Sequence, residues 1–153
     1  MSAPKIKIRA MKEEDVQAIA NIESSCFSKP WTEDNVRYEI KGNPCAHIFI
    51  ATIDEEIVGY LDFMITFNSA TISRICVLGE YRRKGIAQAL LDKMFEVIKK
   101  QDEKVEWITL EVRKDNEAAQ KLYKKNHWEE ITIKKNYYDD GTDAIYMVRS
   151  EAL

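Results

Sequence analysis

The spacing of hydrophobic and polar residues changes several times along the chain, and each change predicts a new element. Residues 5–11 alternate charged and apolar side chains, which is the period of a strand with one solvated face. Residues 12–27 place apolar side chains at helical spacing behind an acidic first turn that suits the helix dipole. A second, short helix is expected from an N-cap at Thr32 to the breaker at residues 41–44.

The middle of the chain is mostly apolar and is interrupted by two short polar turns. We expect strands at residues 47–53, 57–66 and 70–78, joined as an antiparallel meander. The other expected elements are an amphipathic helix from Ile86 to the charged loop at residues 99–104, a strand at 105–113, a helix at 116–126, and a closing strand pair at 128–138 and 143–150.

This order of elements predicts the fold class. One strand, two helices, three strands, a helix, a strand, a helix and two strands follow one another without a repeat, a low-complexity segment or a linker. A length of 153 residues suits one hydrophobic core. We therefore expect a single α/β (α+β) domain over residues 1–153, with a mixed central sheet of about seven strands and four helices.

Composition narrows the classes of partner. Apolar residues make up 45% of the chain and charged residues 32%, the balance of an ordinary globular protein. A net charge of -3 provides no global field that would attract nucleic acid. No segment resembles a signal peptide, and no apolar run approaches the roughly 20 residues that span a bilayer. We expect no direct nucleic-acid partner and no membrane association, and the oligomeric state stays open.

The three cysteines, Cys26, Cys45 and Cys76, are odd in number and widely spaced, and none forms a C-x-x-C pair. This usage supports neither a disulfide framework nor a zinc site. We expect no metal and a reducing, cytoplasmic location.

The segment VLGEYRRKGIAQALLDKMF passes from an apolar strand through three consecutive cations into an amphipathic helix. Unpaired N–H groups and the dipole at such a helix start form an anion site. Nucleotide loops are excluded, because five residues separate Gly79 from Gly85, isoleucine follows, and G-x-G-x-x-G is missing. What remains is Arg82-x-x-Gly85-x-Ala87, a hexad that by itself also fits a solvated cationic helix start.

The place of this hexad, after the third strand of a meander and before a long helix, resembles the acetyl-coenzyme A loop of the GNAT superfamily of N-acetyltransferases, Q/R-x-x-G-x-G/A. A second block, LEVRKDNEAAQKLYKKNHWEEITIKKNYYDDGTDAIYM, resembles the C-terminal half of the ribosomal-protein alanine N-acetyltransferases, the RimI group. The resemblance implies acetyl-coenzyme A as cosubstrate and direct transfer in a ternary complex. The implied acceptor is the N-terminal amine of a protein, such as a ribosomal protein that begins with Ala, Ser or Thr.

The resemblance also implies which residues contact the cofactor. Backbone groups of the strand before the loop would bind the pantetheine arm, and the backbone from Arg83 to Gln88 would bind the pyrophosphate. Cys76 is then expected to be a small buried residue and not a nucleophile, since no histidine is evident to activate it. The implied cofactor residues are Ile75, Cys76, Val77, Arg82, Arg83, Lys84, Gly85, Ile86, Ala87, Gln88 and Asn116, the last of which can also cap a helix.

Acetyl transfer to an amine needs a base for the amine proton and an acid for the departing thiolate. The resemblance assigns the base to Glu111, on a strand where Leu110 and Val112 would face the opposite side. It assigns the acid to Tyr123 on the following helix. Two simpler interpretations stay open, a solvated strand carboxylate for Glu111 and a packing role for Tyr123.

By the same resemblance, Phe27, Trp31, Tyr137 and Tyr138 flank the entrance of the acceptor peptide. The acids of the turn NYYDDGTD would attract a basic chain, or would simply form a solvated turn. They are Asp139, Asp140 and Asp143.

Two features depart from the family pattern. LYKKNHW places His127 where relatives commonly have glycine and Trp128 where they have an aromatic residue, so Asn126 is expected to provide the left-handed helix stop. Ser28 and Lys29 separate an aromatic from a Pro-aromatic pair that are adjacent in close relatives. Acetylation of a small amine or a lysine side chain is an alternative, because the cofactor loop is shared within the superfamily and only the segment with Tyr137 and Tyr138 favours a peptide. A non-catalytic acetyl-coenzyme A-binding module is another, although the presence of both candidate catalytic residues favours an enzyme.

Overall fold

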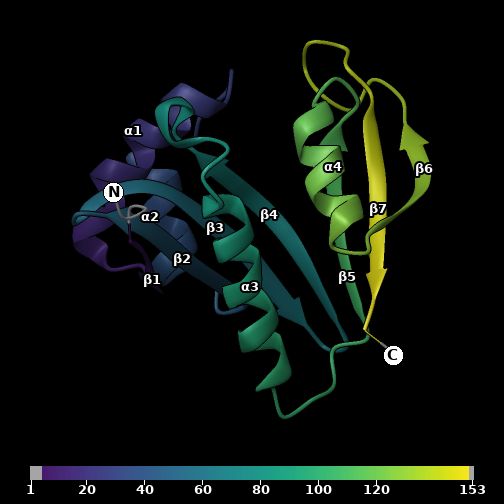
Figure 1. The fold of residues 1–153 in the computed structure, drawn as a ribbon, viewed down its shortest axis with the longest axis horizontal. Coiled ribbons are helices and arrows are strands. Elements are labelled where there is room, and N and C mark those ends of the chain that lie inside the picture. Colours follow the sequence, from purple (N-terminus) through teal and green to yellow (C-terminus); the bar gives the residue numbers. More distant parts are fainter. Residues whose placement is uncertain (1–4, 152–153) are drawn as a thin grey trace. The chain divides into compact units, whose positions relative to one another are not determined.

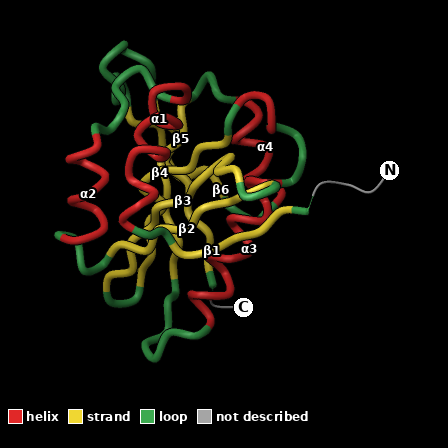
Figure 2. The backbone as a smooth tube through the Cα atoms, turned by 90° about the vertical axis from the view of Figure 1, so that its left-hand side faces the viewer, coloured by secondary structure: helices red, strands yellow, loops and turns green. Residues whose placement is uncertain are grey.

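The computed structural model describes residues 5–151 and contains one seven-stranded sheet with the strand order β1-β2-β3-β4-β5-β7-β6 (Figures 1 and 2). The predicted fold class and element order are confirmed. The strands are β1 Ile6–Ala10, β2 Ala46–Ile53, β3 Glu56–Thr66, β4 Ser69–Val77, β5 Trp107–Arg113, β6 Glu129–Lys134 and β7 Ala144–Ser150. The α-helices of the described residues are α1 Val16–Cys26, α2 Glu33–Lys41, α3 Ile86–Lys99 and α4 Glu117–Lys125.

The chain divides into two compact units, and β3 and β4 contribute residues to both. The first unit consists of Met1–Met64 and Ser73–Lys100, and the second of Ile65–Ile72 and Gln101–Leu153. One domain over residues 1–153 stays a prediction.

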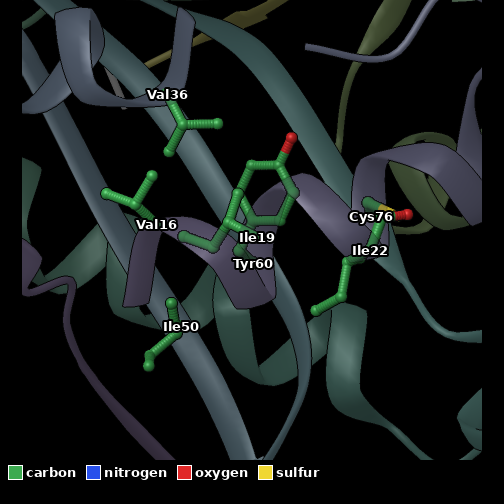
Figure 3. Packing of buried hydrophobic residues seen from close by; sticks show 7 residues of the cluster. All are labelled: Val16, Ile19, Ile22, Val36, Ile50, Tyr60 and Cys76. Atoms are coloured by element: carbon green, nitrogen blue, oxygen red, sulfur yellow. The ribbon is translucent and has the colours of Figure 1, made fainter. Parts of the chain in front are cut away.

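In the first unit, α1 and α2 pack on one face of the antiparallel strands β1, β2 and β3. The period of two in β2 and β3 directs Ile50 and Tyr60 into this layer, where they meet Val16, Ile19 and other apolar side chains (Figure 3). The alternate residues face α3 on the other side, where the Lys93 ammonium lies 5.5 Å from the Phe49 ring centroid.

The helix starts of the first unit follow from local hydrogen bonds. Asp15 accepts the Lys12 N–H at 2.8 Å and pairs with Arg9, so residues 13–15 form a 3-10 turn and α1 begins later than the pattern predicts. The hydrogen bond from Arg9 holds the pKa of Asp15 below its usual value. Thr32 is the N-cap of α2, as predicted, and accepts the Asn35 N–H at 3.2 Å.

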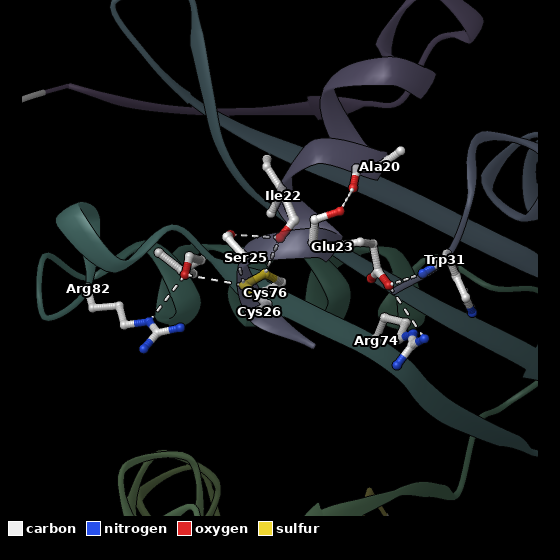
Figure 4. Close-up of a disulfide and its surroundings, with 11 residues drawn as sticks. Ala20, Ile22, Glu23, Ser25, Cys26, Trp31, Arg74, Cys76 and Arg82 are labelled. Atoms are coloured by element: carbon white, nitrogen blue, oxygen red, sulfur yellow. Dashed lines mark hydrogen bonds and ion pairs between the residues drawn. A yellow bond between two sulfur atoms is a disulfide. The ribbon is translucent and has the colours of Figure 1, made fainter. Parts of the chain in front are cut away.

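The expectation that the cysteines form no disulfide is wrong for one pair. Cys26, the last residue of α1, is bonded to Cys76 in β4, and Cys45 is free (Figure 4). Cys76 is only 4% exposed, as expected for a small buried residue. The pair closes a loop of 50 residues, and spacing of this length carries no sequence signal.

In the second unit, β7 lies between β5 and β6 and pairs antiparallel with both. The first three residues of β4 pair with β5 in parallel. Trp128 fastens the end of α4 to this sheet, because its indole N–H donates to the Ile108 carbonyl at 3.0 Å and its ring meets Tyr123 edge-on.

The left-handed residue at the end of α4 is not the predicted one. Asn126 has φ -97°, whereas His127 has φ 74°. His127 therefore occupies both the sequence position and the backbone conformation for which glycine is usual. At the other end, Asn116 caps α4 as expected and accepts the Ala119 N–H at 3.1 Å.

Within residues 5–151, no helix has the length and apolar character needed to cross a membrane.

Candidate active site

The predicted site residues belong to both units. The first unit carries the strand and loop assigned to the cofactor, together with Phe27 and Trp31. The second unit carries Glu111, Tyr123, Asn116 and the two neighbouring tyrosines, Tyr137 and Tyr138.

The predicted anion loop is built by two left-handed residues. Arg83 has φ 63° and Gly85, the N-cap of α3, has φ 81°. Glycine adopts this conformation without steric cost. A Cβ added to Gly85 would meet no heavy atom within 4 Å apart from those of its neighbours in the chain. The loop is therefore open on the side of the glycine, and strain rather than crowding opposes a larger residue there.

The first turn of α3 has the features of an anion site. No side chain caps the helix through Gly85, so the first N–H groups of Ile86, Ala87 and Gln88 depend on partners outside the helix backbone. Arg82, Arg83 and Lys84 are exposed just before this helix end. The backbone and the nearby positive charge together suit a phosphate group.

Arg82 makes a contact that the sequence did not predict. Its Nε donates to the Val77 carbonyl at 3.2 Å, which ties the loop to the end of β4. Ile75 and Val77 are half-buried and Cys76 is buried between them. Gly59 allows β3 to pass close to this stretch, because a Cβ there would lie 2.8 Å from the Cys76 carbonyl oxygen.

Phe27 and Trp31 are brought together by a cation that sequence reasoning missed. The guanidinium carbon of Arg74 lies 4.3 Å from the Phe27 ring centroid and 4.7 Å from that of Trp31. The fully buried Glu23 accepts the Trp31 N–H at 2.8 Å and lies 3.4 Å from Arg74 (Figure 4). Burial raises the pKa of Glu23. The salt bridge between Glu23 and Arg74 thus holds the guanidinium against the two aromatic rings.

A second buried carboxyl group lies in the same unit. Asp62 in β3 is 0% exposed, and neither of its oxygens accepts a hydrogen bond from a donor. Burial, followed by the neighbouring Glu39, raises the pKa of Asp62 to about 9, and Arg74 only partly offsets this rise. Asp62 is therefore protonated in the folded protein at neutral pH.

We expect Asp62→Asn to stabilise the protein at pH 8. The folded-state pKa of about 9 lies above the ordinary aspartate pKa of 3.8, so unfolding releases a proton between these pH values and the free energy of unfolding falls as pH rises through this window. Asparagine has no such proton to lose, and we expect a gain of about 1–3 kcal/mol at pH 8. Urea unfolding at pH 5 and pH 8 measures it.

The matched control for this substitution is Asp34→Asn, since the Asp34 side chain is 95% exposed and pairs only with Arg37 in the same helix. It should change stability little at either pH. A loss of stability in Asp62→Asn at pH 8 would contradict the assignment of a protonated carboxyl group. Glu39, Glu23 and Arg74, which face Asp62, are unchanged in both variants.

Glu111 lies on β5 with the alternation that the sequence predicts. Leu110 and Val112 are buried, whereas the Glu111 side chain is 22% exposed. Its Oε1 accepts a hydrogen bond from Lys134 Nζ at 2.7 Å, a partner that sequence reasoning missed. The same ammonium lies 4.9 Å from the ring centroid of Tyr146 and 5.5 Å from that of Tyr137.

Tyr123 is buried and packs edge-on against Trp128, with ring centroids 5.6 Å apart. Burial raises the pKa of the Tyr123 phenol above its ordinary value of 10.0, and the nearby Tyr138 adds to the rise. The phenol therefore keeps its proton at any physiological pH. The buried hydroxyl is therefore present in the protonated form that a proton donor requires.

Tyr137 and Tyr138 meet edge-on, with ring centroids 5.0 Å apart, at the start of the loop between β6 and β7. Arg113 braces this loop. Its guanidinium carbon lies 4.8 Å from the Tyr138 ring centroid, and its NH2 group hydrogen-bonds to Asp140 and, at 2.8 Å, to Thr142 Oγ1. Burial raises the pKa of Tyr138 to about 12.

Two of the three acids of this loop, Asp140 and Asp143, make hydrogen bonds within the loop. Hydrogen bonds from Thr142, reinforced by Arg113, hold the pKa of Asp140 at about 2. Asp143 accepts the Asn136 N–H at 2.9 Å and pairs with Lys135. These contacts favour the structural interpretation of both acids over recruitment of a basic chain.

Two of the residues that sequence reasoning missed, Glu23 and Asp62, are recognisable in the sequence as charges at apolar positions. Glu23 stands at a helical position between apolar Ile19 and Cys26, and Asp62 interrupts an otherwise apolar strand. Each charge at a core position predicts a buried group that needs a partner. Lys134 carried no comparable signal, because a lysine on an outer strand is usually solvated.

Residues 5–151 contain no group of three or more His, Cys, Asp or Glu side chains placed to hold a metal ion.

Comparison with known proteins identifies the family of this chain. The model of the Acetyltransferase (GNAT) family matches residues 16–128. A Bacillus subtilis (strain 168) protein, provisionally named a ribosomal protein bS18-alanine N-acetyltransferase, is 37% identical over 144 residues, which are 94% of each chain. An N-alpha-acetyltransferase of Saccharolobus solfataricus is 38% identical over 113 residues, covering 66% of this chain and 67% of the relative.

The fold agrees with these relatives. The crystal structure of the ribosomal-protein-S18-alanine N-acetyltransferase from Escherichia coli superposes with a TM-score of 0.86 at 28% identity, covering 97% of this chain and 96% of that one. The chain belongs to the GNAT family of acetyltransferases. It is an N-acetyltransferase by family, and its predicted resemblance to the RimI group is confirmed.

Proposed function

We propose that this protein is an acetyl-coenzyme A-dependent N-alpha-acetyltransferase that modifies the N-terminal amine of a protein. The relatives from Bacillus subtilis and Escherichia coli are named as ribosomal protein bS18-alanine N-acetyltransferases, the former provisionally, and match over more than nine-tenths of this chain. The relative from Saccharolobus solfataricus is named as an N-alpha-acetyltransferase. A ribosomal protein that begins with Ala, Ser or Thr is the acceptor we favour. We propose a cytoplasmic location from the ribosomal acceptor alone, because the Cys26–Cys76 disulfide removes the support that the cysteines gave to a reducing compartment.

The contact between Glu111 and Lys134 carries the assignment of an amine acceptor, and the names of the relatives favour an N-terminal amine over other amines. The Glu111 carboxylate accepts a hydrogen bond at 2.7 Å from the Lys134 ammonium, and an ammonium is also the group that an acceptor amine presents before it reacts. An α-amine has a reference pKa near 8, so at neutral pH it arrives mostly as the ammonium and must lose a proton to attack. Glu111 is then the group that takes this proton, directly or through water.

The cofactor assignment depends on the loop before α3. We propose that N–H groups of residues 83–88 bind the pyrophosphate of coenzyme A, because Gly85 and the left-handed Arg83 expose this helix start and three exposed cations directly precede it. Backbone groups of Ile75, Cys76 and Val77 would pair with the pantetheine amides, and Asn116 would add a side-chain contact. Acetyl-coenzyme A supplies a thioester whose acyl group the neutral amine attacks.

Tyr123 completes the proposed chemistry. When the tetrahedral adduct collapses, the C–S bond breaks and the thiolate takes a proton, which a protonated phenol can donate. Phe27 and Trp31, held by Arg74, and the pair Tyr137 and Tyr138 are proposed to contact the first residues of the acceptor. Direct transfer needs no acetylated protein side chain.

A peptide assay tests the proposal. The protein is given acetyl-coenzyme A with peptides that begin with Ala, Ser or Thr, and free thiol and peptide mass are followed together. We expect one acetyl group per peptide, and none on the same peptides with a blocked N-terminus. Product only from spermidine or from internal lysines would identify a small-amine or lysine acetyltransferase. Bound acetyl-coenzyme A without any product would identify a binding module.

Substitution of Gly85 tests the cofactor loop. We expect Gly85→Val to weaken acetyl-coenzyme A binding by about tenfold, because a β-branched residue is strained at φ 81° and shifts the N–H groups that follow. Calorimetry measures the dissociation constant. Gly79→Val is the control, because Gly79 has equal space around it and no positive φ. Equal affinity in both variants would refute the loop assignment.

A further inference from the structure

Lys134 lies in a small site of the second unit that is built to hold an ammonium group. Its Nζ is 2.7 Å from Glu111 Oε1 and faces the rings of Tyr146 and Tyr137, with centroids at 4.9 Å and 5.5 Å. A carboxylate and two aromatic faces are the groups that bind ammonium ions in proteins. The structure thus contains the site and a ligand for it, and that ligand is a side chain of the protein itself.

Sheet register explains why these groups meet. Glu111 in β5 is directly opposite Tyr146 in β7, and Tyr146 is opposite Thr132 in β6. Lys134 stands two residues beyond Thr132 and so projects on the same face as the other members. Tyr137 follows just after the end of β6. Three of the four groups are therefore fixed on strands of one sheet.

The ammonium in this site is also exchangeable. The Lys134 side chain is 40% exposed and Tyr137 is 48% exposed, so solvent reaches the site. Exposed ion pairs and exposed cation–π contacts are each weak, because solvent competes with both partners. Another ammonium can therefore replace that of Lys134 if it gains further contacts at the site.

We propose that Glu111, Tyr137 and Tyr146 form an ammonium-binding site in which Lys134 is an internal competitor, and that the α-ammonium of an acceptor peptide displaces Lys134 to reach Glu111. This inference rests on the proposed function for the identity of the acceptor. The hydrogen bond to Glu111 raises the pKa of Lys134 and so favours its protonated form, which is not nucleophilic.

The proposal gives a physical reason for a preference between acceptors. A tethered group competes at a high effective concentration, of the order of millimolar or above. A small amine gains only the ammonium contact, which Lys134 already makes, and so competes poorly. A polypeptide makes further contacts through its first residues, and these contacts offset the free energy lost when Lys134 leaves the site. Lys134 would therefore discriminate against small amines and in favour of peptide N-termini.

Kinetics of two lysine variants test this role. We expect Lys134→Met to lower the KM for an alanine-initiated peptide by about fivefold, the equivalent of about 1 kcal/mol of lost competition. The same variant should acetylate alanine amide faster than the unmodified protein does. Lys135→Met is the matched control, because Lys135 is the next residue, is 74% exposed and pairs with Asp143 instead. A higher peptide KM in Lys134→Met would overturn the proposal, because Lys134 would then support binding.

A binding measurement separates this inference from the proposed function. Lysine ε-carbon NMR signals are recorded with coenzyme A present, and the Lys134 signal is assigned by its loss in Lys134→Arg. We expect the free-amine peptide to shift this signal and the N-acetylated peptide to leave it unchanged. Equal shifts with both peptides, or no shift on binding of the free-amine peptide, would overturn the displacement. A selective shift without any turnover would instead retain the ammonium site and refute the proposed function.

Discussion

Replacing Glu111 by glutamine is expected to lower the turnover of an N-terminal alanine peptide by about 100-fold at pH 7. Glutamine retains the size of the side chain and loses the base. Without a base, the rate depends on the amine that is already neutral, and this fraction falls tenfold per pH unit below a pKa near 8. The deficit should therefore grow at pH 6 and shrink at pH 9, which steady-state kinetics over this range would show.

The control for Glu111→Gln is Glu130→Gln, which also removes one lysine ion pair from the second unit. Glu130 Oε1 pairs with Lys124 at 3.0 Å and belongs to no part of the proposed site. We expect its turnover and pH profile to match those of the unmodified protein. If Glu111→Gln lost the same factor at every pH, a role in shaping the site would replace the role as base.

Removal of the Tyr123 hydroxyl is expected to give the second large effect. Tyr123→Phe should lower kcat by about 10-fold to 100-fold, because the thiolate then leaves without its proton donor. The ring stays in place against Trp128, so stability and the affinity for acetyl-coenzyme A should change little. Stopped-flow turnover together with calorimetry separates these quantities.

Tyr60→Phe is the matched control for that experiment. The Tyr60 hydroxyl is buried in the first unit without a hydrogen-bond partner, so its loss should leave turnover unchanged and make the fold no less stable. If Tyr123→Phe behaved in the same way, with normal kcat, Tyr123 would be a packing residue only. The alternative left open by the sequence would then be correct.

The disulfide between Cys26 and Cys76 lies between two predicted parts of the site. It joins the residue before Phe27 to the strand assigned to the pantetheine arm, all within the first unit. Spacing rules address neighbouring cysteines, and a long loop lies between these two. The pair was missed because its proximity depends on how α1 packs on β4.

Features governed by neighbours in the chain were predictable. Thr32 and Asn116 cap their helices as expected, because a capping side chain reaches only the N–H groups two or three residues ahead. The anion loop was recognisable for the same reason, since Gly85 and the cations before it act within one turn. The exception is the end of α4, where His127 rather than Asn126 became left-handed.

The sequence by itself determined the element order, the fold class, the family and the loop proposed to bind the cofactor, because periodicity, caps and short motifs are local. Only the tertiary structure decided which side chains from distant segments meet. Arg74 joined Phe27 to Trp31, Asp62 was left buried without a donor, and the ammonium of Lys134 reached Glu111. These contacts depend on sheet register and on helix packing, which long-range burial selects and no short pattern of residues encodes.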